Sequence, residues 1–339
     1  MKALPYVGLL VGLLALALMV AWRGFGAVAG ILAASGWGLL LLPLVWLPHL
    51  ILGATAWRLL FPPGGAPRLI LAVAAMWMGR AVNTLLPAAT IGGEVVKARV
   101  LTLWRMDAAD AGASVVVDKT VQALSLVLWA LVGIGLMMSR AANDALVAGA
   151  MAGAALLACG VFGFIAAQRA GMFGFLARSA ARVSGRAKRS ALKAGAEEVD
   201  AAIRALYRRP GRVAVAVALR LTARVLVTAE IWLAAFLMGH PITVLEALML
   251  KSMASALRGA FFVVPSGLGV QEAGYVVVGS LAGLSPEFML ALSLATRVRE
   301  LLVSVPGLLA WQHLEGRALW RRLGLGAGRR GSKSTRASR

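Results

Sequence analysis

The stretch GRAVNTLLPAATIGGEVVKAR, residues 79–99, interrupts a sequence that otherwise consists of one apolar helical segment after another. Within it, Arg80 is followed seven residues later by Pro87 and, after seven more, by Glu94, with a Gly-Gly pair immediately before the glutamate. Proline and glycine both disfavour the interior of a helix. The stretch therefore predicts a helix that stops, turns and starts again, with charged side chains gathered at the break.

A second stretch, LRGAFFVVPSGLGVQEAG at residues 257–274, has the same layout. Arg258, Pro265 and Glu272 repeat the spacing of seven residues, and glycines again lie between the proline and the glutamate. Interruptions at corresponding positions in the two halves of a membrane sequence are typical of transporters built from two repeats. The repetition predicts that the two stretches are equivalent elements of one architecture.

The composition places the chain in a lipid bilayer. Of its 339 residues, 60% are hydrophobic and only 14% are charged. Soluble domains are about a quarter charged and cannot cover this much apolar surface, whereas a bilayer accepts it. Cys159 is the only cysteine, and His49, His240 and His313 are scattered, so no disulfide, metal site or cofactor is expected. The sequence predicts an all-α, polytopic membrane helix bundle.

The net charge of +21 is concentrated in two places. Eleven Lys or Arg residues lie in a loop at about 168–212, and eight lie in the tail at 317–339. Basic clusters beside apolar spans mark cytoplasmic segments and attract anionic lipids, so nucleic-acid binding is not expected. The loop contains AEEVDAAIRALYRR, which is typical of an amphipathic surface helix. We predict an inner (cytoplasmic) membrane protein whose N-terminus, basic loop and disordered basic tail are cytoplasmic.

Six apolar segments are long enough to span the bilayer. They lie at about residues 5–22, 28–60, 112–138, 145–167, 213–238 and 288–311. The first has a long apolar run with only Lys2 before it, so a retained helix is favoured over a cleaved secretory signal. Residues 1–316 are accordingly expected to form a single transmembrane domain.

The two broken segments, about 69–96 and 245–284, complete the predicted topology. Counting crossings from the cytoplasmic loop, the first begins and ends on the cytoplasmic side, which a re-entrant hairpin satisfies and a single span does not. The second begins and ends on the outer side, either as a re-entrant hairpin or as two full crossings. Non-helical backbone is tolerated at membrane depth only where it is buried in protein or lines a wet cavity. We therefore predict an inverted repeat of two broken hairpins around a shared binding site.

Two kinds of group at the breaks suit an anion. The half-helices that begin near Glu94 and Glu272 offer free backbone N–H groups and the positive end of a helix dipole. Arg80 and Arg258 precede the breaks, and the planar guanidinium fork binds phosphate through paired hydrogen bonds. The alternative interpretation is that Arg80–Glu94 and Arg258–Glu272 are structural ion pairs that pin each hairpin.

Further charged residues fall inside predicted spans, where each costs roughly 2.5–3.5 kcal/mol on insertion scales and requires a partner or a purpose. They are Asp118, Lys119, Arg220, Arg224, Glu230, Arg297 and Glu300. Arg297 and Glu300 are the strongest candidates, because they share one helix face well inside an apolar run. Arg220 and Arg224 are expected to snorkel to the cytoplasmic interface. Asp118 and Lys119 suit either an interfacial or a functional position.

Four motifs carry a resemblance to a known family: RAVNTLLPAATIGGEVVKARVL, VVDK, PSGLGVQEAG and ATRVRELLVSVPG. They resemble the membrane region of lysylphosphatidylglycerol synthases and their stand-alone, flippase-like relatives, among which the hopanoid-biosynthesis-associated subgroup looks closest. The resemblance covers nearly the whole chain. In the bifunctional relatives this region is assigned lipid translocation between leaflets, and a separate soluble domain performs aminoacylation. Only a short basic tail follows the last span here, so the resemblance implies translocation without synthase activity.

The resemblance and the residue chemistry together define a candidate translocation site. Its members are Arg80, Asn83, Pro87, Gly92, Gly93, Glu94, Lys97, Arg99, Asp118, Arg258, Pro265, Gly267, Gly269, Glu272, Arg297 and Glu300. Arg258 and Glu300 are included on their chemistry, and the others match the family's motifs. Glu94 stands where the family commonly has an Asp, which preserves the charge and alters its reach.

We weigh three functions. The leading one is a lipid flippase or polar-lipid transporter for a phospholipid or hopanoid-type lipid, in which Arg80, Arg258 and the half-helix N-termini hold the headgroup. The second is a membrane-embedded headgroup transferase with Glu94 or Glu272 as general base, although no nucleophile or metal set accompanies them. The third is a non-catalytic scaffold for lipid-biosynthesis enzymes. The leading hypothesis involves no catalytic residues and has membrane lipids, anionic phospholipid or hopanoid, as partners.

Overall fold

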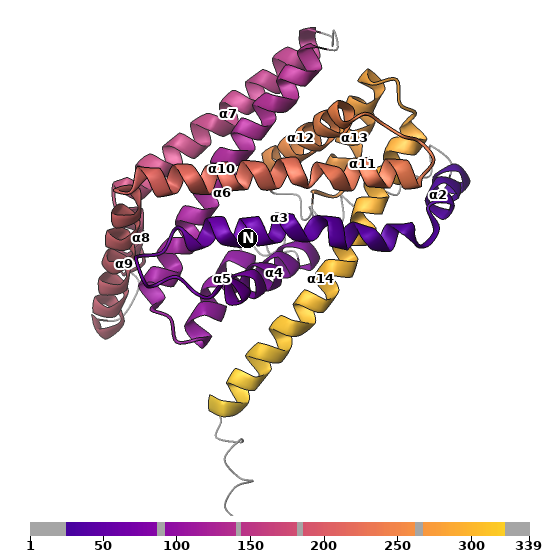
Figure 1. Cartoon of the computed structure of the whole chain (residues 1–339). Coiled ribbons are helices and arrows are strands. Elements are labelled where there is room, and N and C mark those ends of the chain that lie inside the picture. The colour runs from indigo at the N-terminus through magenta and orange to yellow at the C-terminus, as the bar shows by residue number, and fades with distance from the viewer. Residues whose placement is uncertain (1–24, 87–91, 140–143, 182–185, 262–266, 323–339) are drawn as a thin grey trace, which may run out of the picture.

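The computed structural model describes residues 25–322 apart from 87–91, 140–143, 182–185 and 262–266 (Figure 1). Every regular element in this part of the chain is a helix, which confirms the predicted all-α class. Three helical segments there are long and apolar enough to cross a membrane: Gly36–Arg58, Ala108–Met138 and Val147–Arg169. The span predicted at 5–22 lies outside the described residues.

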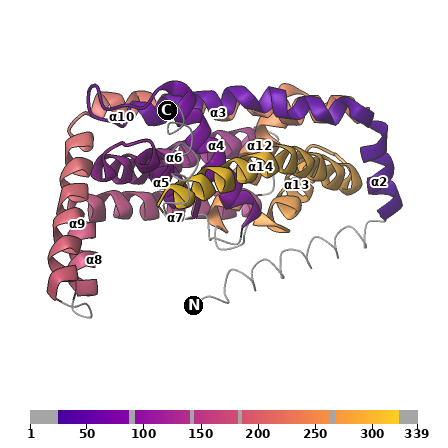
Figure 2. The same cartoon turned by 90° about the horizontal axis from the view of Figure 1, so that it is seen from below.

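The described helices follow one another closely along the chain. Up to residue 169 they are α2 (Phe25–Ala34), the 3₁₀ helix η1 (Gly36–Leu41), α3 (Leu42–Arg58), α4 (Leu69–Leu85), α5 (Gly92–Leu103), α6 (Ala108–Met138) and α7 (Asp144–Arg169). After it they are α8 (Met172–Ala181), α9 (Arg186–Tyr207), α10 (Pro210–Leu226), α11 (Thr228–Leu237), α12 (Val244–Ala260), α13 (Val270–Leu281) and α14 (Pro286–Arg322). α3 and α10 lie side by side along one edge of the molecule, and α8 and α9 lie at its left-hand end (Figures 1 and 2).

Two predicted spans are divided in the structure. The segment predicted at 28–60 is interrupted between α2 and η1, where Gly36 has a φ of +49°, a conformation that glycine adopts readily. The segment predicted at 213–238 is interrupted at Val227, between α10 and α11. Neither interruption contains the Pro-Gly pattern of the two broken stretches, so neither could be predicted from that pattern.

The basic loop and the start of the basic tail are largely helical, and residues 196–207 of the predicted surface helix AEEVDAAIRALYRR lie in α9. The basic loop at 168–212 is largely helical, because α9 buries Ile203 and Leu206 and its Asp200 accepts a 2.6 Å hydrogen bond from the backbone N–H of Gly174 in the first turn of α8. Residues 317–322 continue α14, so the prediction that the basic tail is disordered from 317 onward is wrong for these residues. Their composition of Arg, Ala and Leu favours helix.

Each Pro-Gly stretch joins two antiparallel helices that pack together: α4 with α5, the first hairpin, and α12 with α13, the second hairpin. In the first, a Cβ added to Gly79 would lie 2.6 Å from the carbonyl oxygen of Gly93. In the second, a Cβ added to Gly274 would lie 2.8 Å from a methyl carbon of Leu257. Small residues therefore let the two arms of each hairpin approach closely, as is common between membrane helices.

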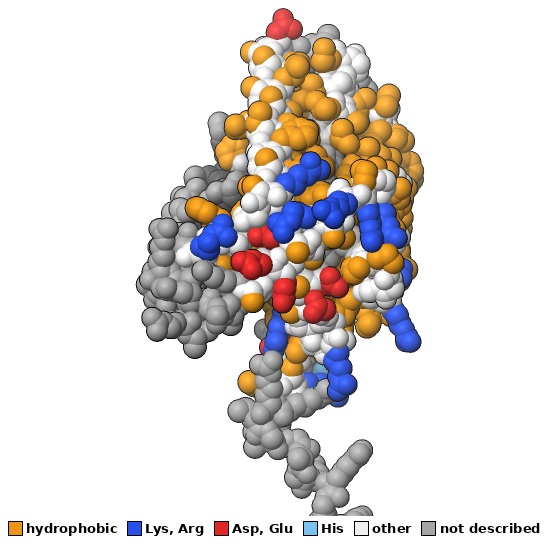
Figure 3. Space-filling model, turned by 90° about the vertical axis from the view of Figure 1, so that its left-hand side faces the viewer, with side chains coloured by type: hydrophobic (Ala, Val, Ile, Leu, Met, Phe, Trp, Pro, Cys, Tyr) orange, Lys and Arg blue, Asp and Glu red, His pale blue; other side chains and the backbone are white. Residues whose placement is uncertain are grey.

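Two apolar cores surround the hairpins. One includes Trp46 and Trp57 and packs around the first hairpin, whereas the other includes Tyr275 and Phe288 and packs around the second. Large apolar side chains also remain exposed, such as Leu156 of α7 at 77%. On the face nearest α8 and α9, hydrophobic side chains cover the upper part and charged ones gather below them (Figure 3). A bilayer would cover such an apolar surface.

Candidate functional site

A cavity of about 540 Å³ lies between the helices and is lined by side chains from both hairpins. The first hairpin contributes Arg80, Asn83 and Thr84 from α4. The second contributes Arg258 from α12 and Gln271 from α13. The two arginines singled out in the repeated stretches therefore face one shared space, although they belong to opposite halves of the chain.

The lining of the cavity is amphipathic. Its basic side chains are Arg80, Lys119, Arg224, Lys251, Arg258 and Arg299, and Glu300 is the only carboxylate among the described lining residues. Apolar side chains enter from α6 and α7: they are Leu126, Trp129 and Leu157. A space with this lining suits a molecule that is negatively charged at one end and apolar at the other.

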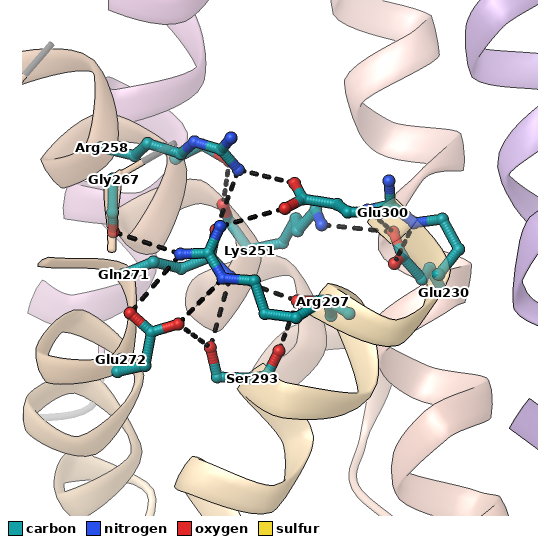
Figure 4. A network of polar contacts seen from close by, with 12 residues as sticks. Glu230, Lys251, Arg258, Gly267, Gln271, Glu272, Ser293, Arg297 and Glu300 are labelled. Carbon is teal, nitrogen blue, oxygen red and sulfur yellow. Dashed lines mark hydrogen bonds and ion pairs between the residues drawn. The ribbon is translucent and has the colours of Figure 1, made fainter. Parts of the chain in front are cut away.

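An ion network attaches the second hairpin to α14 (Figure 4). Arg297 lies 3.0 Å from Glu272 through Nε and 3.0 Å from Glu300 through Nη1. Arg258 Nη1 lies 2.7 Å from the other oxygen of Glu300. Arg297 Nη2 also donates a 3.2 Å hydrogen bond to the carbonyl oxygen of Gly267, beside the break. The network thus fixes both arms of the hairpin and the backbone between them.

A second ion network lies around Glu230, whose side chain is fully buried. Arg299 Nε lies 2.8 Å from one Glu230 oxygen, and Lys251 Nζ lies 3.3 Å from the other. Only Glu230 was marked from the sequence. Arg299 and Lys251 also lie in apolar helical runs, like the charged residues that were predicted to lie within spans. A charge inside such a run is the signal that would have identified them.

The first hairpin is tied to α6 by a third ion network. Lys97 Nζ lies 2.8 Å from Glu94 and 2.7 Å from Asp118, and Lys119 Nζ lies 3.2 Å from Glu94. Asp118 is fully buried and also pairs with Arg220. Asp118 is therefore an interior residue rather than an interfacial one, and it holds α5, α6 and α10 together.

The ion pairs of the alternative interpretation, Arg80–Glu94 and Arg258–Glu272, are absent from the part of the chain that the structure describes. Glu94 pairs with Lys97 and Lys119 rather than with Arg80, and Glu272 pairs with Arg297 rather than with Arg258. The reason is geometric. Each glutamate lies in the first turn of the second arm, on the side that packs against α6 or α14, whereas each arginine faces the cavity.

The expectation that Arg220 and Arg224 snorkel to the interface is also wrong. Arg220 is buried against Asp118, and Gly53 of α3 leaves room for it, since a Cβ there would lie 2.9 Å from Arg220 Nη1. Arg224 lines the cavity, and it donates 3.1 Å hydrogen bonds to Ser125 Oγ and to the carbonyl oxygen of Gln122. Both side chains turn into the bundle because hydrogen-bond acceptors lie there.

Trp46 and His49 of α3 also line the cavity, and neither was identified from the sequence. The guanidinium carbon of Arg80 lies 4.8 Å from the centre of the Trp46 ring, and that of Arg299 lies 5.4 Å from the same ring. His49 Nδ1 donates a 3.1 Å hydrogen bond to the carbonyl oxygen of Ala223. A single tryptophan or histidine in an apolar run carries no sequence signal for such a position.

The half-helix N-termini contribute less to a possible anion site than predicted. The backbone N–H of Gly93 donates a 2.7 Å hydrogen bond to Asn83 Oδ1, so this amide is not free for an anion. Gly92 begins α5. Gly267 and Gly269 have φ values of +60° and +77°, which explains glycine at both positions, and Gly267 lines the cavity. Pro87 and Pro265 lie outside the described residues.

The structure brings most of the predicted site residues into the cavity wall or into the networks beside it. Arg80, Asn83, Arg258, Gly267 and Glu300 line the cavity. Glu94, Lys97, Asp118, Glu272 and Arg297 lie in the adjoining networks. Arg99 is elsewhere: its Nη2 lies 2.9 Å from Glu315, near the end of α14.

Comparison with protein families matches residues 6–307 to the family described as Lysylphosphatidylglycerol synthase TM region. The match spans both hairpins, the three ion networks and α14 as far as Gly307. No curated protein and no solved structure matches the chain.

Proposed function

This chain belongs to the lysylphosphatidylglycerol synthase TM region family, and from that premise we propose that it carries a polar lipid between the two leaflets of the inner membrane. The family and the apolar helices establish a membrane protein. The lipid translocase is our proposal, as is the orientation with the N-terminus, the α8–α9 region and the end of α14 in the cytoplasm. The basic composition of residues 168–212 and 317–339 supports that orientation.

The observation that carries the proposal is the shared cavity. Arg80 and Arg258, from two hairpins with the same residue spacing, line it together. Transporters place their substrate site where two such broken elements meet. The basic groups of the lining can hold a headgroup, and Leu126, Trp129 and Leu157 can contact acyl chains.

The positions of the two glutamates favour transport over headgroup transfer. A general base must reach a proton of the substrate. Glu94 and Glu272 are absent from the described cavity lining, and Glu272 is fully buried with its Oε1 accepting hydrogen bonds from Ser293 and Arg297. Both carboxylates instead hold the hairpins to α6 and α14. Their role in this proposal is to keep the cavity walls in place.

A reconstitution experiment tests the proposal. The purified full-length chain is placed in liposomes that contain fluorescent phosphatidylglycerol, and leaflet exchange is followed by dithionite quenching. We expect exchange with the wild-type protein and a reduction of at least about tenfold in Arg80→Ala and Arg258→Ala, because each loses a charge-assisted hydrogen-bond donor in the cavity.

Arg208→Ala is the matched control, because Arg208 is an exposed arginine between α9 and α10 and contacts no part of the cavity. Its exchange rate should equal that of the wild type. Size-exclusion profiles establish whether each variant is folded. Wild-type exchange rates in both cavity variants would refute the proposal.

A further inference from the structure

Four of the six basic side chains that line the cavity form ion pairs with carboxylates. Lys119 pairs with Glu94, Arg258 with Glu300, and both Lys251 and Arg299 with Glu230. Arg80 and Arg224 differ from them: no described carboxylate forms an ion pair with either. The two exceptions line the same cavity, and Arg224 is close enough to Arg80 for the two charges to repel each other.

Two guanidinium groups without a described carboxylate at ion-pair distance are unfavourable inside a membrane protein unless something balances them. Glu300 and Glu230 act on Arg80 only from beyond that distance. The hydrogen bonds that Arg224 makes are to neutral oxygens of Ser125 and Gln122, and Arg80 stacks on Trp46. These contacts orient the side chains without neutralising them. An anion that enters the cavity would complete the charge balance that the protein leaves open.

We infer that Arg80 and Arg224 form a phosphate subsite for the headgroup of the transported lipid, an inference that rests on the proposed function. The guanidinium fork matches phosphate oxygens through paired hydrogen bonds. The two arginines come from α4 and α10, so a bound phosphate would bridge the first hairpin to a helix outside both hairpins. A phosphate monoester, with a charge between about −1.5 and −2, balances the pair better than a diester with a single charge.

The surroundings of the subsite fit this ligand. Trp46 holds Arg80 in place through its ring, and His49 fixes α3 to α10 through Ala223, the residue before Arg224. Asn83 uses its Oδ1 to accept from Gly93, which leaves its amide N–H groups to donate within the cavity. Arg80, Arg224 and Asn83 thus all offer hydrogen-bond donors, as phosphate recognition requires. Glu300, the one carboxylate in the described lining, already pairs with Arg258.

Isothermal titration calorimetry on the full-length chain in detergent tests the subsite without measuring transport. The titrants are dihexanoyl phosphatidic acid, dihexanoyl phosphatidylglycerol, dihexanoyl phosphatidylcholine and inorganic phosphate. We expect phosphatidic acid to bind most tightly, phosphatidylglycerol less tightly, and phosphatidylcholine at least about tenfold more weakly than phosphatidic acid. Inorganic phosphate should bind more weakly than phosphatidic acid, because it lacks the apolar contacts with Leu126, Trp129 and Leu157.

Variants of Arg80 and Arg224 test whether phosphatidic acid binds at this subsite. Arg80→Gln and Arg224→Gln should each weaken phosphatidic acid binding at least about tenfold. Arg80→Lys and Arg224→Lys, which keep the charge and lose the fork, should show intermediate affinity. Arg208→Gln, an exposed control, should bind as the wild type does. If the glutamine variants fail to fold, the lipid selectivity of the wild-type protein still decides the question.

Equal affinity for phosphatidylcholine and phosphatidic acid would overturn the subsite. Inorganic phosphate binding as tightly as phosphatidic acid would overturn the lipid assignment and identify free phosphate as the ligand. Leaflet exchange without selective phosphatidic acid binding would leave the proposed function standing and remove only the subsite. Selective phosphatidic acid binding without leaflet exchange of any lipid would support the subsite and refute the proposed transport.

Discussion

At the scale of single residues, the charged side chains are of two kinds. Some face the cavity and can act on a ligand, whereas others pair with one another and hold the helices together. Asp118 belongs to the second kind. It is fully buried and pairs with Lys97 and Arg220, which come from α5 and α10. Glu315 also pairs with an arginine, Arg99, but both side chains are partly exposed, at 38% and 30%. The two sites allow the same chemical change to be compared in a buried and an exposed setting.

We predict that Asp118→Asn destabilises the protein by about 3–5 kcal/mol, because it leaves Arg220 buried without a carboxylate partner and leaves Lys97 with Glu94 alone. Glu315→Gln should change stability by less than about 1 kcal/mol, since exposed ion pairs contribute little. Chemical unfolding of both variants in detergent, followed by far-UV circular dichroism, measures the difference. Similar unfolding midpoints for the two variants would show that the Asp118 network does not stabilise the fold.

At the scale of helices and hairpins, the structure explains why glycine stands at some helical positions and is optional at others. Gly79 of α4 faces Gly93 of α5, with no room for a side chain between them. Gly153 of α7 has no atom within 4 Å of the position that a Cβ would occupy. A helical glycine is otherwise less favourable than alanine by about 1 kcal/mol.

Gly79→Ala should therefore destabilise the first hairpin by about 1–3 kcal/mol, because the two arms must move apart to admit the methyl group. Gly153→Ala should be neutral or slightly stabilising, since it adds helix propensity without a clash. Thermal unfolding of both variants in the same detergent gives the comparison. A Gly79→Ala variant as stable as the wild type would mean that the close approach of α4 and α5 does not constrain the hairpin.

The same elements show how far the sequence alone could be taken. Broken helices at 69–96 and 245–284 were predictable because proline and glycine act locally on the backbone. The partners of the charges were not predictable in the same way. Glu94 bonds to Lys119 of α6 and Glu272 to Arg297 of α14, so each pairing depends on which face of the hairpin packs on a distant helix. Spacing along the chain does not contain that information.

The position of Arg224 was not predictable from the sequence either. Its position near the end of an apolar segment suggested an interfacial residue, whereas in the folded chain it lines the cavity and bonds to Ser125 and Gln122. From the sequence alone, charges could be placed within membrane helices, and Arg80 and Arg258 could be related by their repeated spacing. Which cations are neutralised, and which remain open to a ligand, depends on the tertiary packing of α6, α10 and α14.

At the scale of the whole molecule, α14 connects the two hairpins. Near its start, Arg297 and Glu300 bind the second hairpin. Farther along, its Val303 carbonyl oxygen accepts a 2.7 Å hydrogen bond from Trp77 Nε1 of the first hairpin, and Glu315 pairs with Arg99. One helix of 37 residues thus contacts both walls of the cavity. A movement of either hairpin would have to be accommodated by this helix.

The proposed orientation of the molecule in the membrane can be tested on the first hairpin and α7 together, which gives the last prediction. α7 is a candidate span, so Asp144 at its start and Arg208 beyond its basic end belong on opposite sides of the membrane. If the first hairpin is re-entrant, Arg68 before α4 and Arg105 after α5 lie on one side, the cytoplasmic one, because the basic segments are retained there. A single crossing by this segment would place them on opposite sides.

Cysteine labelling distinguishes these arrangements, and the single native cysteine makes it direct. In a Cys159→Ser background, the substitutions Asp144→Cys, Arg208→Cys, Arg68→Cys and Arg105→Cys each introduce one thiol at an exposed position. A membrane-impermeant maleimide added to intact spheroplasts should label Asp144→Cys alone, and the other three should react only after the membrane is opened. Labelling of only one of Arg68→Cys and Arg105→Cys in intact spheroplasts would show that the first hairpin crosses the bilayer. The cavity could then no longer be the meeting point of two elements that enter from opposite faces.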